Sequence, residues 1–164
     1  MTLDRLWAGW RLHYVDGAAR EPNEGQCLFC GLGSMDPSGA DVIAENDDVY
    51  VVPNAYPYTS GHLLVVPRRH VAALDALDAR EAGLLMEMMR SAATAVTAAY
   101  RPDGINIGMN LGRAAEAGIP GHLHVHVLPR WHADTNFMTS VAEARVLPES
   151  LPDTLERLRA AWPT

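Results

Sequence analysis

The chain has 164 residues, 48% of them hydrophobic and 20% charged, which is the composition of a single globular domain. Its formal net charge of −7 argues against broad binding of nucleic acid by bulk electrostatics, although a small anionic ligand can still meet a locally positive site. All 13 basic residues are arginine, which excludes Schiff-base chemistry on lysine and a P-loop lysine.

The first part of the chain is predicted to form an arm, because residues 1–20 carry large apolar side chains that can pack against the rest of the molecule. It has no continuous apolar core like that of a signal peptide, and no later segment is long enough to span a membrane. We therefore expect a cytoplasmic protein with no membrane partner. Residues 31–41 are rich in turn-forming residues and are predicted to be a loop.

Two short apolar segments then predict β-strands. Residues 49–52 end at Pro53, and residues 63–66 lie between Gly61 and Pro67. The seven residues that link Pro53 to Gly61 supply the connection between these strands.

A long helix follows. Asp78 can cap its first turn, with Glu81 three residues later in a capping-box arrangement. Apolar side chains recur at helical spacing beyond this point. They are Leu85, Met88, Met89, Ala92, Val96 and Tyr100. Pro102 marks the end of the helix.

Residues 104–111 and 122–128 alternate between apolar and polar side chains and are close enough in sequence to pair as a hairpin. Residues 151–162 form a short amphipathic helix. This order predicts an α+β fold with a mainly antiparallel sheet, one long helix and a short C-terminal helix. The chain divides into an N-terminal arm, a central domain and a C-terminal extension, over residues 1–24, 25–135 and 136–164.

Three histidines, His122, His124 and His126, alternate along the last predicted strand. Because successive side chains of a strand point to opposite faces, all three imidazoles share one face and the residues between them face the core. Such a set could hold a metal, or one imidazole could attack phosphorus while its neighbours hold the phosphate. A chance cluster of surface histidines is the remaining interpretation.

The segment His122-Leu-His124-Val-His126-Val-Leu128 resembles the signature of the histidine triad family, His-φ-His-φ-His-φ-φ. The resemblance extends upstream. Asn54 and the segment from Gly61 to Pro67 are similar to the family's nucleoside-binding strands, and Asn110-Leu-Gly112 with Ala117-Gly118 is similar to its phosphate-binding loop. The segments after Pro129 and around Trp7 are similar to a bacterial branch of diadenosine-polyphosphate phosphorylases.

This resemblance implies that His124 attacks the α-phosphorus and forms a covalent nucleotidyl-histidine. A backbone carbonyl would hold its other ring nitrogen as N–H. His126 would donate to the phosphate oxygens, and His62 would support it.

The resemblance also implies the substrate-binding residues. Asn54 would hold the ribose, Asn110 and the amide of Gly118 would donate to the phosphate oxygens, and Trp131 would contact the nucleotide at the mouth of the site. Many family members have glutamine after Ala-Gly, whereas this chain has Ile119. We therefore expect the phosphate contacts to come from Asn110 and backbone amides.

Attack of inorganic phosphate on the intermediate would give a phosphorylase that releases ADP, and attack of water would give a hydrolase. The branch resemblance favours phosphorolysis of diadenosine tetraphosphate to ADP and ATP, with no metal required for the chemistry. The alternatives are a nucleoside phosphoramidase, a non-enzymatic nucleotide-binding module and a metalloenzyme that uses the three histidines together. Family members of this kind usually form homodimers.

Cys27 and Cys30, the two cysteines of the chain, form a C-x-x-C pair. Two cysteines are too few for the disulfide framework of a secreted protein. A redox dithiol, two inert cysteines and a metal site are the possible interpretations. Zinc needs two more ligands, and His70 and His122 are the candidates. The resemblance favours structural zinc, because some family members bind it through C-x-x-C and two histidines at such positions.

Overall fold

The computed structural model describes residues 27–34, 41–115, 117–132, 134 and 147–163. Its centre is an antiparallel sheet of five strands in the order β1-β2-β3-β5-β4. The strands are β1 Ala44–Glu45, β2 Val49–Pro53, β3 Leu63–Pro67, β4 Gly104–Gly108 and β5 Val125–Arg130. The helices are α2 Leu28–Ser34, α3 Ala79–Tyr100 and α5 Leu151–Ala160, with single 3₁₀ turns at η2 Leu74–Ala76 and η3 Arg113–Ala115. The predicted α+β fold is confirmed.

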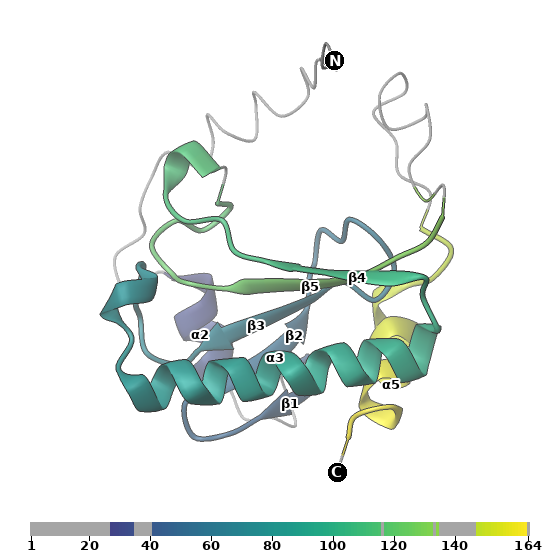
Figure 1. Ribbon diagram of the computed structural model, residues 1–164, viewed down its shortest axis with the longest axis horizontal. Coiled ribbons are helices and arrows are strands. Elements are labelled where there is room, and N and C mark those ends of the chain that lie inside the picture. Colours follow the sequence, from purple (N-terminus) through teal and green to yellow (C-terminus); the bar gives the residue numbers. More distant parts are fainter. Residues whose placement is uncertain (1–26, 35–40, 116, 133, 135–146, 164) are drawn as a thin grey trace.

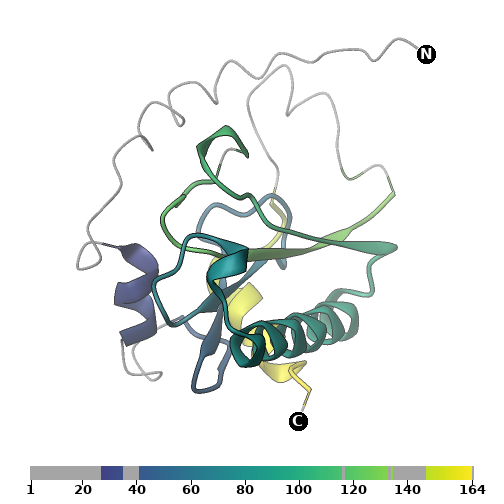
Figure 2. The same ribbon diagram turned by 60° about the vertical axis from the view of Figure 1, so that its left-hand side comes forward.

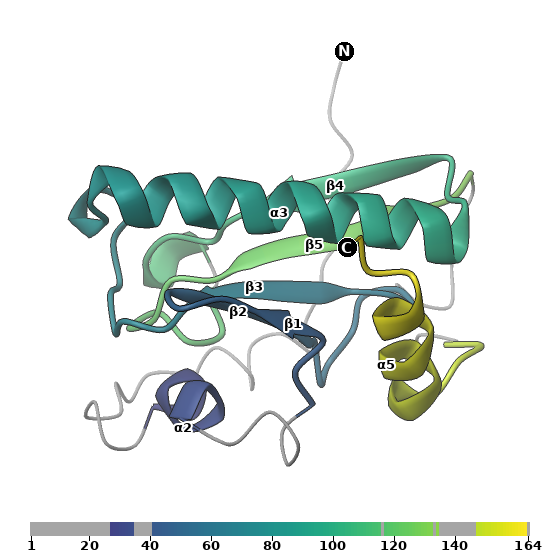
Figure 3. The same cartoon turned by 90° about the horizontal axis from the view of Figure 1, so that it is seen from below.

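The helices lie on both sides of the sheet. The long helix α3 runs across one face (Figure 1), and the short helix α2 lies on the opposite face (Figures 2 and 3). Among the helices that the structure describes, none is long and apolar enough to cross a membrane.

Helix α3 has the boundaries that the capping pattern predicts. The Asp78 side chain accepts a hydrogen bond from the amide of Glu81, and the Glu81 side chain accepts one from the amide of Asp78. At the other end Arg101 adopts a left-handed conformation with φ 46°, and Pro102 follows. The buried side chains of the helix include all of those at the predicted spacing except Tyr100, which is half-buried, and Ala95 is buried in addition.

The alternation of side chains along the strands builds two separate cores. One lies under α3 and includes Val49, Val51, Leu63, Val65 and Leu158 of α5, together with Leu123, Val125 and Val127. The other lies under α2 and includes Cys27, Phe29, Tyr50, Val52, Leu64 and Val66. Because even-numbered residues of β3 and β5 face α2, the imidazoles of His124 and His126 lie on the α2 side of the sheet.

The strands around the histidines are shorter than predicted. β5 begins only at Val125. Before it, the amide of Leu123 donates to the carbonyl oxygen of Val71 at 2.6 Å, so Leu123 does not pair with β3. β4 ends where Gly108 pairs with His126. The predicted strands over 104–111 and 122–128 therefore form a hairpin, and the histidines lie at the end where the connecting segment joins β4 to β5.

The predicted loop over residues 31–41 is wrong at its start, because residues 31–34 continue α2. The amide of Gly31 donates to the carbonyl of Cys27, and the burial of Cys27 and Phe29 holds this helix on the sheet. The rest of that loop up to residue 40, the predicted arm over residues 1–24 and residues 136–146 of the predicted extension lie outside the described residues.

Candidate active site

His124 is a buried imidazole whose two ring nitrogens have different environments. Its Nδ1 lies 2.8 Å from the main-chain carbonyl oxygen of His122, which can only accept a hydrogen bond, so Nδ1 carries the proton. The Nε2 lone pair is then available for attack. Burial lowers the pKa of His124, with the hydrogen bond to His122 opposing the shift, and this keeps the ring neutral and nucleophilic near pH 7.

His62 and His126 form a chain of hydrogen bonds with a defined direction. The amide of Tyr58 donates to His62 Nδ1 at 3.1 Å, so the proton of a neutral His62 sits on Nε2. His62 Nε2 lies 2.9 Å from His126 Nδ1 and donates to it. The proton of a neutral His126 therefore sits on Nε2. Burial, and then the proximity of His124, lower the pKa of His126 to about 4, so the neutral form dominates near pH 7.

The Nε2 atom of His126 is buried and has no hydrogen-bond partner within the described residues. A buried N–H group without a partner is costly, and such groups concentrate where a ligand is bound. The rings of His124 and His126 are 5.1 Å apart. The site thus places a nucleophilic lone pair beside an N–H donor on one face of the sheet.

Two aromatic residues that the sequence did not single out contact these imidazoles. Phe29 lies against His124 with 5.0 Å between ring centroids. Tyr58 stacks on His126 at 5.8 Å and an angle of 14°, and it also contacts His62 at 4.7 Å. A weak signal for Phe29 exists in the sequence, because it stands between the two cysteines. Tyr58 lies in the β2–β3 connection, where no pattern marks it.

The second group of polar side chains is the predicted metal site, Cys27, Cys30, His70 and His122. Its four ligand atoms lie within 4.8 Å of one another. His122 Nδ1 is 3.3 Å from Cys27 Sγ and 3.6 Å from Cys30 Sγ, and His70 Nδ1 is 3.2 Å from Cys30 Sγ. Tetrahedral zinc with ordinary Zn–S and Zn–N bond lengths places sulfur and nitrogen about 3.6 Å apart. The cluster therefore fits a tetrahedral metal ion.

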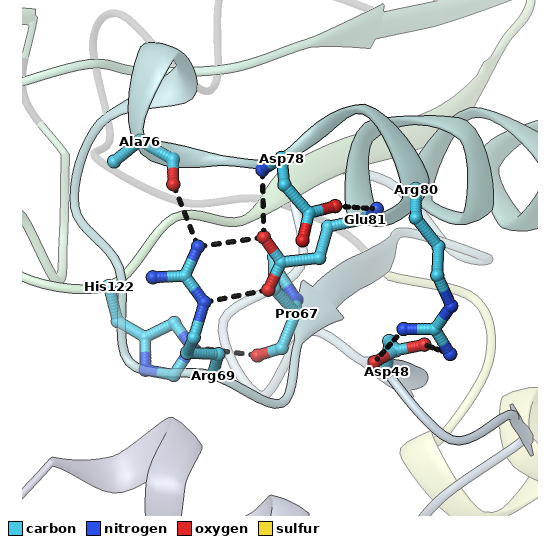
Figure 4. A network of polar contacts seen from close by, with 8 residues as sticks. All are labelled: Asp48, Pro67, Arg69, Ala76, Asp78, Arg80, Glu81 and His122. Carbon is cyan, nitrogen blue, oxygen red and sulfur yellow. Dashed lines mark hydrogen bonds and ion pairs between the residues drawn. The ribbon is translucent and has the colours of Figure 1, made fainter.

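The other ring nitrogen of His122 is also arranged as in metal sites. Nε2 lies 2.8 Å from the carbonyl oxygen of Pro67, the last residue of β3, and donates to it (Figure 4). A histidine that binds metal through one nitrogen usually donates from the other to a carbonyl or carboxylate. Burial lowers the pKa of His122, which keeps Nδ1 unprotonated and able to bind a cation.

The predicted substrate-binding residues lie just beyond the ends of strands or in a loop. Asn54 Nδ2 lies 3.3 Å from His62 Nδ1, and its Oδ1 accepts from the amide of Tyr56. Asn110 lies two residues beyond the end of β4, and Gly118 lies in the loop before His122. The Trp131 ring packs edge-on against Tyr100 of α3, with 6.3 Å between ring centroids.

Comparison with known proteins gives the site a context. Residues 37–133 match the model of the HIT domain. The chain is 38% identical to the AP-4-A phosphorylase of Mycobacterium tuberculosis over 165 aligned positions, which cover 98% of this chain and 85% of the relative. It is 29% identical to the adenosine 5'-monophosphoramidase of Xenopus tropicalis, over 68% of this chain and 74% of the relative.

One solved structure with a similar fold is described as Zn-bound. It is a Zn-bound histidine triad family protein from Mycobacterium smegmatis, which is 29% identical and superposes with a TM-score of 0.63. The superposition covers 85% of this chain and 94% of that one.

Proposed function

The chain belongs to the histidine triad (HIT) family, and on that premise we propose that it cleaves diadenosine polyphosphates by transferring a nucleotidyl group to His124. The observation that carries this proposal is the pairing of the two imidazoles. His124 presents a lone pair on Nε2, and the neighbouring His126 presents an N–H that has no partner within the described residues. One is suited to attack phosphorus, and the other to stabilise the oxygen that leaves.

In the first step His124 Nε2 forms a bond to the α-phosphorus while the bond from phosphorus to the bridging oxygen breaks. The remaining adenosine polyphosphate (ATP from diadenosine tetraphosphate) leaves as an anion, and the N–H of His126 donates a hydrogen bond to the charge that develops on its oxygen. The carbonyl of His122 holds the proton on Nδ1 of His124 and so stabilises the positive charge on the ring. Attack of a second nucleophile on phosphorus then releases His124.

We propose that the four predicted substrate-binding residues hold the rest of the substrate. Asn54 would hold the ribose, Asn110 and the amide of Gly118 would donate to the phosphate oxygens, and Trp131 would contact the nucleotide after turning from Tyr100. The two amide-bearing side chains and the backbone amide carry no charge, which fits an acidic protein that contains no lysine.

We propose inorganic phosphate as the second nucleophile, which makes the reaction phosphorolytic. The support is the identity of 38% with an AP-4-A phosphorylase across nearly the whole chain. Diadenosine tetraphosphate is incubated with and without phosphate, and the products are separated by ion-exchange chromatography. We expect ADP and ATP only when phosphate is present. AMP and ATP formed without phosphate would identify a hydrolase instead.

The variant His124→Ala tests the nucleophile. We expect turnover and covalent labelling by nucleotide to be lost, while nucleotide binding is retained. A variant that still forms the adduct at the normal rate would disprove the assignment. Binding of nucleotide by the wild type without any turnover would instead favour a non-enzymatic binding module.

We further propose that Cys27, Cys30, His70 and His122 hold structural zinc and that the protein is a homodimer. The geometry of the cluster and the Zn-bound relative support the first proposal. Protein purified without chelator should contain about one zinc per chain. The exposed outer edge of β4 supports the second proposal, which is tested at the end of the Discussion.

A further inference from the structure

His122 takes part in both polar clusters. Its side chain points into the thiol cluster, with Nδ1 3.3 Å from Cys27 Sγ. Its main-chain carbonyl accepts the hydrogen bond from Nδ1 of His124, 2.8 Å away. The position of this single residue therefore determines both one corner of the metal site and the acceptor that orients the nucleophile.

A second contact joins the two clusters through α2. Phe29 lies between Cys27 and Cys30 in sequence and is only 3% exposed. Its ring lies 5.0 Å from the ring of His124 and 5.5 Å from that of His122. Any displacement of α2, which contains Cys30 and directly follows Cys27, therefore moves a side chain packed directly on the nucleophile.

We propose that the thiol cluster of Cys27, Cys30, His70 and His122, with its metal ion bound, is a positioning device for His124. Loss of the ion lowers the rate of nucleotidyl transfer while the residues that bind nucleotide stay in place. This proposal rests on the function proposed above for His124, but its structural part, the orientation of one imidazole, can be observed without substrate.

The physical reason lies in how α2 is held. A helix of seven residues does not persist on its own, and α2 contains two glycines, which weaken it further. A bound ion would tie Cys30 of α2, and Cys27 just before it, to His122 and to His70, which follows β3. Without the ion these ties are weak thiol contacts, so α2, Phe29 and the backbone of His122 gain freedom. A shift of about 1 Å at a reacting group can cost about 10²-fold in rate.

The experiment uses His70→Ala, because His70 is a ligand of the cluster and is separated from His124 by His122. His70→Cys restores a fourth ligand and serves as the rescue. Leu28→Ala is the matched control, because Leu28 lies in α2 between the cysteines and its side chain is 59% exposed. Each protein is assayed for zinc, for kcat and KM with diadenosine tetraphosphate and phosphate, and by ¹⁵N NMR of the His124 ring.

We expect His70→Ala to lose zinc and to show a fall in kcat of about 10- to 100-fold with KM changed by less than about threefold. The ring signals of His124 should no longer report a single tautomer with the proton on Nδ1. His70→Cys should recover zinc, kcat and the tautomer signal, and Leu28→Ala should match the wild type throughout.

A zinc-free His70→Ala protein with normal kcat and an unchanged His124 tautomer would overturn the proposal. Where His70→Ala does not fold, wild-type protein stripped with chelator and titrated with zinc alone gives the same NMR readout, and an unaltered His124 signal would again overturn it. If instead no dinucleoside polyphosphate is turned over by the zinc-loaded wild type, the proposed function fails, while the NMR result still decides whether the ion positions His124.

Discussion

The imidazole of His126 lies among buried groups, and desolvation, followed by the proximity of His124, lowers its pKa from 6.5 to about 4. In the unfolded chain the same ring binds a proton once the pH falls below 6.5. Between these two values the unfolded state holds more protons than the native state, so the free energy of unfolding falls as the pH falls. The stability that the neutral His126 ring contributes is fully present above about pH 6.5 and is lost as the pH falls to about 4.

We expect His126→Gln to reduce this acid sensitivity, because glutamine does not titrate. The ring keeps some contact with solvent, so the wild type should lose on the order of 1 kcal/mol more than the variant between about pH 7 and about pH 5. Urea unfolding of both proteins at these two pH values measures the difference. Equal losses in the two proteins would show that His126 titrates normally in the fold.

Gly61, which precedes His62, adopts φ +80°, a left-handed conformation that favours glycine. A Cβ atom at this position would lie 2.6 Å from Cε2 of Tyr100 on α3. We expect Gly61→Ala to lower the free energy of unfolding by about 1–3 kcal/mol through strain and overpacking.

Gly83→Ala is the matched control for this prediction. Gly83 lies inside α3, and a Cβ there meets nothing within 4 Å. The change should therefore raise the free energy of unfolding by about 0.5–1 kcal/mol. Denaturant unfolding of the two variants should show opposite signs, and a stable Gly61→Ala protein would mean that Tyr100 moves aside without cost.

Strand geometry alone predicts that His124 and His126 share a face, because the period of side chains in a strand does not depend on context. The orientation of the His122 ring could not be predicted in this way. It depends on contact with Cys27, which lies 95 residues earlier in the chain and reaches the sheet only when α2 docks. The resemblance to the family supplied this pairing, whereas the residues themselves left it open.

At the scale of elements, the start of α3 is held by a network of polar contacts (Figure 4). The Asp78 and Glu81 side chains cap the first turn reciprocally. Arg69, one residue before His70, donates to both carboxylate oxygens of Glu81 and to the carbonyl of Ala76. These contacts lower the pKa of Glu81 to about 2, so the network stays charged throughout the neutral range.

We expect Asp78→Ala to lower the free energy of unfolding by about 1 kcal/mol, because the cap of Glu81's amide is lost. Glu87→Ala is the control, since it removes an equal charge from an exposed position within the same helix. Thermal unfolding of both variants should show a lower Tm for Asp78→Ala alone. A similar decrease in both would assign the effect to net charge and not to the cap.

The elements themselves differ in how far the sequence predicts them. Helix α3 combines a capping box, apolar spacing and a proline stop, and all of these signals are local. Helix α2 carries none of them, and it forms because Cys27 and Phe29 are buried against the sheet. β1, with only two residues, is too short for any periodic pattern. Local signals therefore predicted the long elements, and tertiary contacts determined the short ones.

At the scale of the whole molecule, the two faces of the sheet have different roles. The face under α3 is packed by apolar side chains, while the face under α2 carries the five clustered histidines, the two thiols and Phe29. His126 lies within β5, and His62 and His124 directly precede β3 and β5, so these strands hold the three imidazoles in place. Rigid elements hold reacting groups more precisely than loops do.

β4 is one of the two edge strands of the sheet, at the end opposite β1. β4 pairs with β5 on one side and with no other strand in the described part of the chain. Ile107, the fourth of the five residues of β4, is 49% exposed, and Met86 on α3 is 63% exposed. Open strand edges with apolar side chains readily pair with a second copy of the same strand. We therefore expect two protomers to join through β4 and to form a dimer by this edge.

Ile107→Arg tests this arrangement, because it places two like charges at the centre of a symmetric contact. We expect the dissociation constant of the dimer to rise at least about tenfold, which corresponds to about 1.4 kcal/mol. Leu28→Arg adds the same charge at an exposed position on α2, on the opposite face of the sheet, and should leave the dimer intact. Sedimentation equilibrium of the three proteins measures both changes. A monomeric wild type, or an Ile107→Arg protein that dimerises normally, would show that this edge is not the interface.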